Sequence, residues 1–356
     1  MSDRAARLAE KLPEAGADLL VVTSLVNVRY LTGFTGSNAI ALVGPDTRVF
    51  LTDFRYVEQS AAEVDDAFDR QIGPELMELL PDLLPPSTGR LAFEDAHMTV
   101  RAHRRLRELV DDRVELVAGG DLVESLRVVK DAEEIARIGE AAKLADAALR
   151  QIMEQGLVGR TEVQVATALE RAMNDLGAQR PSFDTIIAAG PHGALPHAKP
   201  RDVEIGPGEL VVIDWGAELD GYCSDCTRTL ATGDLPDAAL SAYDLVQEAQ
   251  VAGVDAIHAG VGGREADSAA RDVIGAAGHA EHFGHGLGHG VGLEIHEAPR
   301  LSQRSDSVLA SGNVVTVEPG VYVPGDFGVR IEDLVVVTET GCTILTSVPK
   351  DLITVG

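Results

Sequence analysis

Short apolar runs of strand length recur through the first third of the chain. They occur at residues 18–23, 39–43, 48–52, 90–94 and 114–117. The turn sequence Gly44-Pro45-Asp46 separates the second run from the third, and a basic stretch at 101–109 predicts an exposed helix. Residues 81–89 are rich in proline and predict a connection. Strands that alternate with helices predict an α/β unit in this region.

Helical patterns follow the pair Gly119-Gly120, which we interpret as a hinge. Asp131 can cap a helix, and Glu134 can reach back to the cap as in a capping box. Apolar residues then continue at helical spacing as far as Ile152. Thr161 is predicted to cap a second helix. A pair of long helices should therefore open the second part of the chain.

The rest of the sequence is rich in strand patterns. Further helices are predicted only over 236–259 and 263–277. A β-rich core flanked by paired helices predicts an α+β domain. Because 356 residues are too many for one typical core, we expect two domains, at residues 1–122 and 126–356.

Composition and charge narrow the class of protein. A hydrophobic content of 45% and a charged content of 24% are ordinary for a soluble globular protein. No apolar run approaches the roughly 20 residues that span a bilayer, and the polar start of the chain differs from a signal peptide, so we expect a cytoplasmic protein. The formal net charge of −27 argues against nucleic acid and anionic membranes as partners.

The cysteines do not predict a disulfide framework, because there are only 3 of them and the number is odd. Cys223 and Cys226 form a Cys-x-x-Cys pattern. Their flanks resemble a strand, in which residues three apart point to opposite faces. We therefore disfavour a redox or zinc role for this pair.

A stretch at 284–297 combines histidine with glycine. His285, His289 and His296 lie there among alternating glycines. Glycine allows sharp bends and close backbone approach, and histidine is the commonest metal ligand and proton carrier near neutral pH. The alternative is a flexible surface loop in which the histidines are incidental.

Four carboxylates fall into two predicted hairpins. Asp214 and Asp225 lie on either side of the turn signal Asp220-Gly221, so we expect them roughly opposite each other with Cβ atoms about 5 Å apart. Glu318 and Glu332 are placed in the same way about Gly325. Buried carboxylates without partners are unfavourable by several kcal/mol. These acids therefore need cations, which are either bound metal ions or the nearby Arg228 and Arg330.

Two mirrored acidic pairs and a histidine loop favour the metal interpretation. Oxygen-rich ligands with one imidazole suit Mn²⁺, with Co²⁺, Fe²⁺ or Zn²⁺ as alternatives. Four acids exceed the needs of one ion, so two divalent ions about 3.5–4 Å apart are expected. Mg²⁺ with a phosphate substrate is the competing use, but the sequence has no phosphate-binding loop.

At these residues the sequence resembles the pita-bread metallopeptidases, which include methionine aminopeptidase, aminopeptidase P and prolidase. The resemblance covers residues 126–356, and an N-terminal piece, Tyr30 to Ser37, looks like the extra creatinase-like domain of the Xaa-Pro branch. It implies an α+β pita-bread fold after an N-terminal α/β domain. The matching segments are Leu195-Pro196-His197, Val212 to Gly216, Ser224 to Thr229, Gly288-His289-Gly290 through Glu297, Val317 to Gly320 and Val329 to Asp333.

The resemblance also implies roles for individual residues. Glu318 would be both a ligand and the proton shuttle, and His197, His285 and His296 would line the substrate site. Arg330 would hold a carboxylate in place. The implied metal ligands are Asp214, Asp225, His289, Glu318 and Glu332.

The implied reaction is metal-assisted hydrolysis of the peptide bond between an N-terminal residue and proline. His296 would stabilise the oxyanion, and Glu318 would carry a proton to the leaving nitrogen. Arg300 lies where prolidases place an arginine for the substrate carboxylate, so aminopeptidase P and prolidase both stay open. The resemblance also implies a proline-containing peptide as substrate and a homodimer. A metal-free creatinase-like hydrolase and a non-catalytic binding module are the other classes considered.

Overall fold

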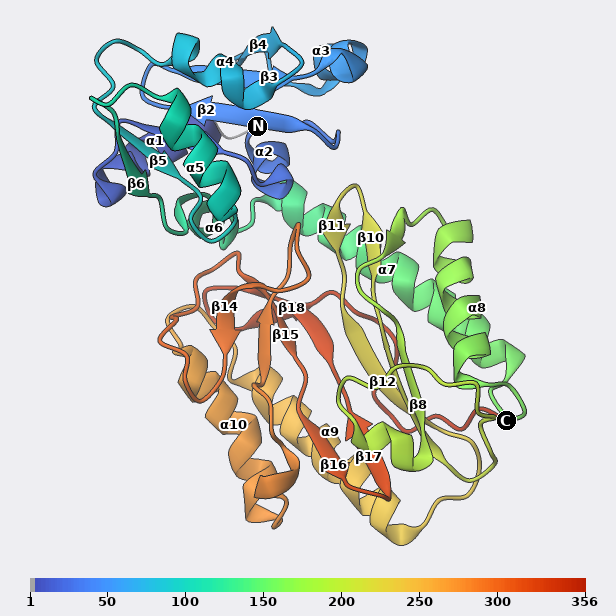
Figure 1. Ribbon diagram of the computed structural model, residues 1–356. Helices are drawn as coiled ribbons and strands as arrows, with labels where there is room; N and C mark the ends of the chain where they lie inside the picture. The colour runs from blue at the N-terminus through green and yellow to red at the C-terminus, as the bar shows by residue number, and fades with distance from the viewer. Residues whose placement is uncertain (1–3) are drawn as a thin grey trace. The chain divides into compact units, whose positions relative to one another are not determined.

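The computed structural model describes residues 4–356. The chain forms two compact units, Met1–Arg127 and Val128–Gly356 (Figure 1). The first unit is built on a six-stranded sheet in the order β4-β3-β2-β1-β5-β6. Its strands are β1 (Leu19–Val22), β2 (Ala39–Val43), β3 (Arg48–Thr52), β4 (Asp69–Ile72), β5 (Arg90–Phe93) and β6 (Glu115–Ala118).

Helices cover the sheet of the first unit, which confirms the predicted α/β character. They are α1 (Arg4–Lys11), α2 (Leu25–Thr32), α3 (Val57–Glu63), α4 (Leu76–Leu83), α5 (Val100–Leu109) and α6 (Leu122–Arg127). The prediction of a connection at 81–89 was partly wrong, because α4 includes Pro81. Leu76 and Leu80 in α4 are buried in the same core as Leu19 and Val21 of β1, so packing maintains the helix despite the proline.

The second unit combines four long helices with several small sheets (Figure 1). The helices are α7 (Ala132–Gln155), α8 (Glu162–Asp175), α9 (Asp237–Asp255) and α10 (Gly263–Ala276). Both predicted helix starts are confirmed, since Asp131 with Glu134 and Thr161 with Gln164 each form a capping box. The strands are β7 (Arg180–Pro181), β8 (Ile186–Ala189), β9 (Leu210–Trp215), β10 (Ala217–Leu219), β11 (Tyr222–Cys223), β12 (Cys226–Ala231), β13 (Gly288–Gly290), β14 (Glu297–Leu301), β15 (Val314–Val317), β16 (Gly320–Val323), β17 (Phe327–Arg330), β18 (Asp333–Val337) and β19 (Cys342–Ile344).

Each helix pair packs on its own sheet and forms its own core. α7 and α8 bury Leu149 and Leu169 with residues of β8, β9 and β12, which form one sheet. α9 and α10 bury Val246 and Ile274 with residues of β15 and β18, which belong to the sheet β14-β13-β15-β18-β19. The predicted α+β domain is therefore confirmed, with each helix pair packed on a different sheet.

The two predicted hairpins differ in how well their register was anticipated. Gly320 pairs with Arg330 and Val317 with Asp333, so the ladder is centred on Gly325, as predicted, and brings Glu318 level with Glu332. The first hairpin is shifted by two residues from the prediction, because Asp214 pairs with Thr227 rather than lying opposite Asp225. The reason is a two-residue turn in which Asp220 and Gly221 adopt φ values of 48° and 76°.

Two further expectations concern the cysteines and membranes. Cys223 and Cys226 are buried free thiols, and burial raises the pKa of Cys223 to about 12, which keeps that thiol protonated and unreactive. Among residues 4–356, none of the helices is both long enough and apolar enough to cross a bilayer.

Candidate metal centre

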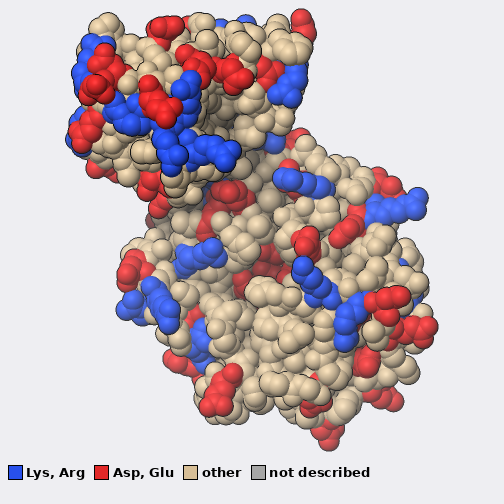
Figure 2. Space-filling view, viewed as in Figure 1, with Lys and Arg blue, Asp and Glu red and all other residues tan. Residues whose placement is uncertain are grey.

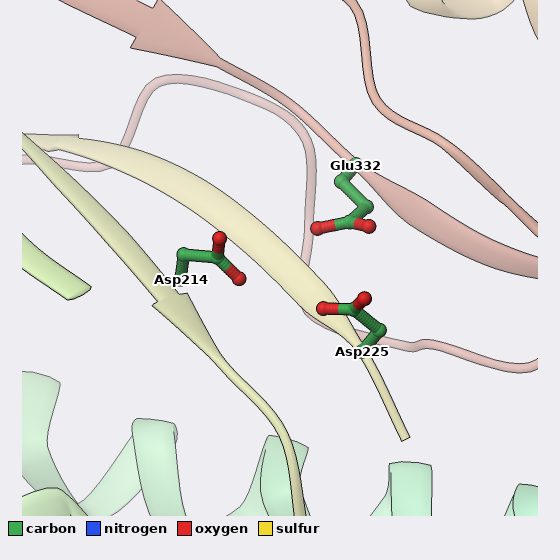
Figure 3. A group of neighbouring side chains, drawn as sticks. All are labelled: Asp214, Asp225 and Glu332. Atoms are coloured by element: carbon green, nitrogen blue, oxygen red, sulfur yellow. The ribbon is translucent and has the colours of Figure 1, made fainter. Parts of the chain in front are cut away.

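Three carboxylates from different segments converge in the second unit (Figure 3). Asp214 lies in β9, Asp225 lies between β11 and β12, and Glu332 lies between β17 and β18. One oxygen from each can be chosen so that all lie within 4.8 Å of one another. The two-residue register shift places Asp214 and Asp225 diagonally across their strands, which still leaves both carboxylates within reach of one point.

The environment of these acids favours their neutral form unless a cation is present. Burial raises the pKa of Asp225 well above its usual value, and the neighbouring Glu332 raises it further. Burial likewise raises the pKa of Glu332, with Glu318 and Asp214 adding to the effect. Burial raises the pKa of Asp214 despite the opposing charge of Arg330. The cluster thus needs either protons or positive charge.

His289 and Glu318 complete the cluster. The His289 ring Nδ1 lies 3.1 Å from the Gly290 carbonyl, so we assign its proton to Nδ1. Its Nε2 atom then presents a lone pair 3.4 Å from Glu318 Oε1 and 3.6 Å from Asp225 Oδ2. Burial lowers the pKa of His289 to about 3, so the ring is neutral and is ready to act as a ligand.

These donors fit divalent metal ions. The Asp214 Oδ1 atom is buried and has no hydrogen-bond partner among the described residues, and the neutral His289 Nε2 atom faces carboxylate oxygens. A buried oxygen without a hydrogen bond and a nitrogen lone pair that faces carboxylate oxygens are both unfavourable in the protein alone. A bound cation would make both arrangements favourable. Four carboxylates and one imidazole supply hard oxygen ligands with a single nitrogen, which suits the first-row divalent ions expected from the sequence.

The alternative in which arginines neutralise the acids is correct for one of them only. Arg330 Nη2 donates to Asp214 Oδ2 at 2.7 Å. Arg228 instead pairs with Asp333, at 2.8 Å. Arginine therefore orients Asp214 but does not balance the charges of the other three acids.

Sequence reasoning missed Tyr322 and Thr227, which orient this centre. The Arg330 guanidinium donates to Tyr322 Oη at 2.8 Å and to Thr227 Oγ1 at 3.0 Å. Thr227 in turn donates to the Glu332 carboxylate at 2.7 Å, and Tyr322 Oη lies 2.9 Å from His285 Nε2. Tyr322 and Glu318 belong to different segments, because β15 ends at Val317 and β16 begins at Gly320, so a strand pattern does not link them. Only the fold shows that it lies beside Arg330.

One cavity of about 550 Å³ brings the predicted site residues together. In Figure 2, acidic side chains are set back in a hollow near the middle of the second unit. The cavity is also lined by residues that the sequence did not single out, including Phe183, Asp184, Lys199 and Ile295. The predicted residues in its lining are His197, Asp214, Asp225, His285, His289, His296, Arg300, Glu318, Arg330 and Glu332.

A buried ion pair fixes the loop that carries His296. Lys130 Nζ lies 3.0 Å from Glu297 Oε2, and the two side chains are 1% and 6% exposed. Glu297 Oε1 also accepts the Glu294 backbone N–H at 3.0 Å. The rings of His296 and His289 lie 4.4 Å apart. The pair therefore anchors the residue next to His296 beside the metal cluster.

We expect Lys130→Met to lower the free energy of unfolding by about 3–5 kcal/mol, because it leaves a buried carboxylate without its lysine. Chemical denaturation measures this change. Lys143→Met, on the exposed face of α7, is the matched control and should change stability by less than about 0.5 kcal/mol. Equal stabilities of the two variants would contradict a structural role for the pair.

Comparison with known proteins places this site in a family. Residues 136–339 match metallopeptidase family M24, and residues 4–129 match the creatinase/prolidase N-terminal domain. An uncharacterized peptidase of Bacillus subtilis is 43% identical over 348 residues, covering 98% of each chain.

Two solved structures are similar over the whole chain. A Xaa-Pro dipeptidase from Bacillus anthracis is 41% identical with a TM-score of 0.96, covering 99% of each chain. An X-Pro aminopeptidase from Thermotoga maritima is 36% identical with a TM-score of 0.91, covering 97% of this chain and all of the other. The chain is therefore a hydrolase that belongs to metallopeptidase family M24, with a creatinase/prolidase N-terminal domain.

Proposed function

We propose that this protein is a dinuclear-metal peptidase that hydrolyses the bond between an N-terminal residue and proline, and that it acts as a Xaa-Pro dipeptidase. The observation that carries the proposal is the convergence of four carboxylates, two buried and two half-buried, and the neutral His289 in one open cavity. The ligands would be Asp214, Asp225, His289, Glu318 and Glu332. The names of similar proteins supply the preference for proline.

Divalent ions held by these ligands would supply the positive charge that activates water and polarises the peptide carbonyl. Oxygen ligands predominate, so Mn²⁺ is the ion that we propose. The proposal also includes a homodimer located in the cytoplasm, as implied by the resemblance to the Xaa-Pro branch.

The chain's own residues then handle the protons. Burial raises the pKa of Glu318 to about 7, which suits a group that must accept a proton from water and pass it to the proline nitrogen. Burial lowers the pKa of His296, and the positive charge of Arg300 is the second contribution in the same direction. His296 is therefore neutral at pH 7 and can donate a hydrogen bond to the carbonyl oxygen as negative charge develops on it.

Binding groups surround this centre. His197 lines the cavity, on the side that we assign to proline. Tyr322 and the Gly286 carbonyl hold the ring of His285 at the cavity wall. Arg330 keeps Asp214 in place.

Unpaired cations at the cavity favour a dipeptide substrate. Arg300 and Lys199 both line the cavity and are exposed. Among residues 4–356, no carboxylate forms an ion pair with either side chain. In a Xaa-Pro dipeptide the proline residue carries the free C-terminal carboxylate, whereas in a longer peptide the same carbon belongs to a peptide bond. We therefore assign Arg300 to that carboxylate, with Lys199 as a second nearby positive charge.

We expect Arg300→Met to lower kcat/KM for a Xaa-Pro dipeptide by about 10- to 100-fold, as for the loss of one charge-assisted hydrogen bond. The same change should have little effect on the corresponding Xaa-Pro amide. Steady-state kinetics on the dipeptide, its amide and a Xaa-Pro tripeptide measures both effects.

The control for this experiment is Arg304→Met, which removes an exposed arginine in the turn after β14, outside the cavity lining. A wild-type protein that prefers the tripeptide would contradict the dipeptidase assignment. Absence of hydrolysis of every proline peptide would contradict the proposed function as a whole.

A further inference from the structure

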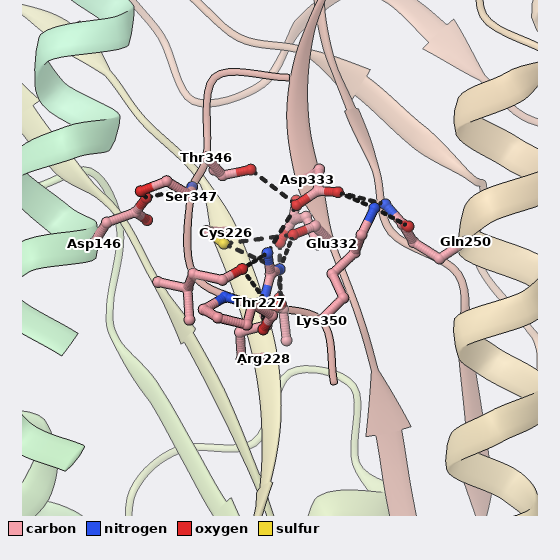
Figure 4. Close-up of polar contacts among 12 residues, drawn as sticks. Asp146, Cys226, Thr227, Arg228, Gln250, Glu332, Asp333, Thr346, Ser347 and Lys350 are labelled. Carbon is pink, nitrogen blue, oxygen red and sulfur yellow. Dashed lines mark hydrogen bonds and ion pairs between the residues drawn. The ribbon is translucent and has the colours of Figure 1, made fainter. Parts of the chain in front are cut away.

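A buried guanidinium lies directly behind two residues of the metal centre (Figure 4). Arg228 is 1% exposed. Its Nη1 atom donates to the Thr227 carbonyl at 2.9 Å and also to the Glu332 carbonyl. The Thr227 hydroxyl donates to the Glu332 carboxylate at 2.7 Å. One guanidinium therefore joins the backbone of Glu332 to the backbone of the residue that orients its carboxylate.

Asp333 holds Arg228 in this position. The Asp333 carboxylate accepts hydrogen bonds from Arg228 Nη2 at 2.8 Å and from Thr346 Oγ1 at 2.9 Å. It also accepts from Gln250 Nε2 at 2.9 Å and from Lys350 Nζ at 2.8 Å. Each oxygen of this buried carboxylate thus accepts two hydrogen bonds. These bonds fix the position of Asp333, the residue that follows Glu332.

Two of these four donors, Thr346 and Lys350, belong to one short stretch of chain. We call residues 346–350 the 346–350 segment. Its carbonyls at Val348 and Pro349 accept from Arg228 Nε at 3.1 Å and 3.0 Å. Ser347 donates to Asp146 of α7, with its hydroxyl at 2.7 Å, and Lys350 donates to Gln250 of α9 at 2.9 Å. The segment is therefore tied to both helix pairs and to Arg228, as Figure 4 shows.

We propose that the 346–350 segment is a positioning element for the metal centre, and that Thr346 and Lys350 act through Asp333 and Arg228. Together they fix the separation between Thr227 and Glu332, and so hold the Glu332 carboxylate in the orientation that binds a cation. This inference rests on the proposed function only in that Glu332 is a metal ligand. None of these groups touches the substrate or the ion.

The reason for a distant support is charge repulsion among the ligands. In the cluster, Glu332 shares its surroundings with Asp214, Asp225 and Glu318. Like charges at this distance push a flexible carboxylate away from its neighbours. A rigid hydrogen-bonded support prevents that movement and lowers the reorganisation needed for binding. Removing such supports typically lowers metal affinity by 10- to 100-fold.

The test uses substitutions at the edge of the network, so that Arg228 and Asp333 keep each other as partners. Thr346→Val and Lys350→Met each remove one donor to Asp333, and the double variant removes both. Isothermal titration calorimetry of Mn²⁺ into the metal-free protein measures affinity, and chemical denaturation measures stability. We expect the Kd for Mn²⁺ to rise by roughly 10- to 100-fold in the double variant and by a smaller factor in each single variant.

Two controls separate positioning from a loss of stability. Leu169→Ala opens a cavity in the hydrophobic core that α8 forms with α7 and the β8, β9 and β12 sheet. It should lower stability while changing the Kd for Mn²⁺ by less than about twofold. Thr346→Ser keeps the hydroxyl and should restore the wild-type Kd. If the double variant does not fold, the comparison of Thr346→Val with Thr346→Ser decides the question.

The outcomes differ for the two proposals. Substitutions at Thr346 and Lys350 that lower stability but leave the Kd for Mn²⁺ unchanged would overturn the positioning role. Wild-type protein that binds no Mn²⁺ would overturn the proposed metal site itself, and this inference with it.

Discussion

Glu318→Gln is expected to lower kcat for a Xaa-Pro dipeptide by about 10³-fold or more, because an amide cannot accept the proton of the attacking water. Glu318 is suited to this transfer, since burial raises its pKa to about 7 and Thr316 Oγ1 donates to its Oε1 at 3.0 Å. The Thr316 hydroxyl thus fixes one oxygen and leaves the other for the reacting groups. Steady-state kinetics in Mn²⁺ measures the change in kcat.

Glu318 is also a proposed ligand, so the metal content of the variant must be measured beside its activity. An amide oxygen is a weaker ligand, and some loss of affinity is expected together with the loss of turnover. Glu339→Gln is the matched control, because Glu339 is an exposed acid at a turn of the same unit. Near-normal hydrolysis by the Glu318 variant at full metal content would refute the assignment.

The register of the second hairpin could be predicted from the sequence alone. Its ladder keeps one register from Gly320–Arg330 to Val317–Asp333, so counting outward from Gly325 correctly placed Glu318 beside Glu332. The first hairpin could not be counted in this way without knowing the turn type. Asp220 adopts a φ of 48°, and the resulting two-residue turn moves the centre of the hairpin by one residue.

Contacts between side chains that are far apart in the sequence could not be predicted from sequence patterns. Lys130 and Glu297 are 167 positions apart, and nothing in the pattern around Lys130 distinguishes a buried lysine from an exposed one. The pairing of Arg228 with Asp333 likewise depends on which strands become neighbours, and the sequence allowed Arg228 to pair with a ligand instead. Side-chain partners of this kind are fixed only by tertiary packing.

The candidate site residues are easier to recognise in a sequence than the groups that support them, for a physical reason. A ligand set is recognisable by residue type, because few side chains bind hard cations. The supporting groups include a threonine, a tyrosine and a glutamine, which occur throughout any protein. Thr227 and Tyr322 therefore carry no signal of their own until Arg330 is seen beside them.

Removal of the metal should make stability depend on pH in a characteristic way. Burial raises the pKa of Glu318 to about 7, and it raises the pKa values of Asp214, Asp225 and Glu332. Groups whose pKa is higher in the folded than in the unfolded state stabilise the fold at low pH, and that contribution is lost as the pH rises through the folded value. The metal-free protein should therefore lose stability between pH 6.5 and pH 8.

Divalent ions should reverse this loss, because they bind the deprotonated carboxylates and need not displace protons at the higher pH. We expect Mn²⁺ to raise the free energy of unfolding more at pH 8 than at pH 6.5, and by about 4 kcal/mol when its concentration is 1,000 times the Kd. Chemical denaturation in Mn²⁺ and in chelator, at both pH values, measures the difference.

The histidines oppose this loss only in the lower part of the pH window. Burial lowers the pKa of His285 to about 4 and of His289 to about 3, so their contribution to stability grows as the pH rises through the unfolded value of about 6.5 and is constant from roughly one pH unit above it. A variant that keeps both histidines and lacks carboxylates separates the two effects. The double variant Asp225→Asn with Glu332→Gln removes two of the raised carboxyl groups. It should flatten the pH dependence of the metal-free protein and reduce the effect of Mn²⁺. A metal-free protein that gains stability between pH 6.5 and pH 8 would show that these acids are not held together under mutual repulsion.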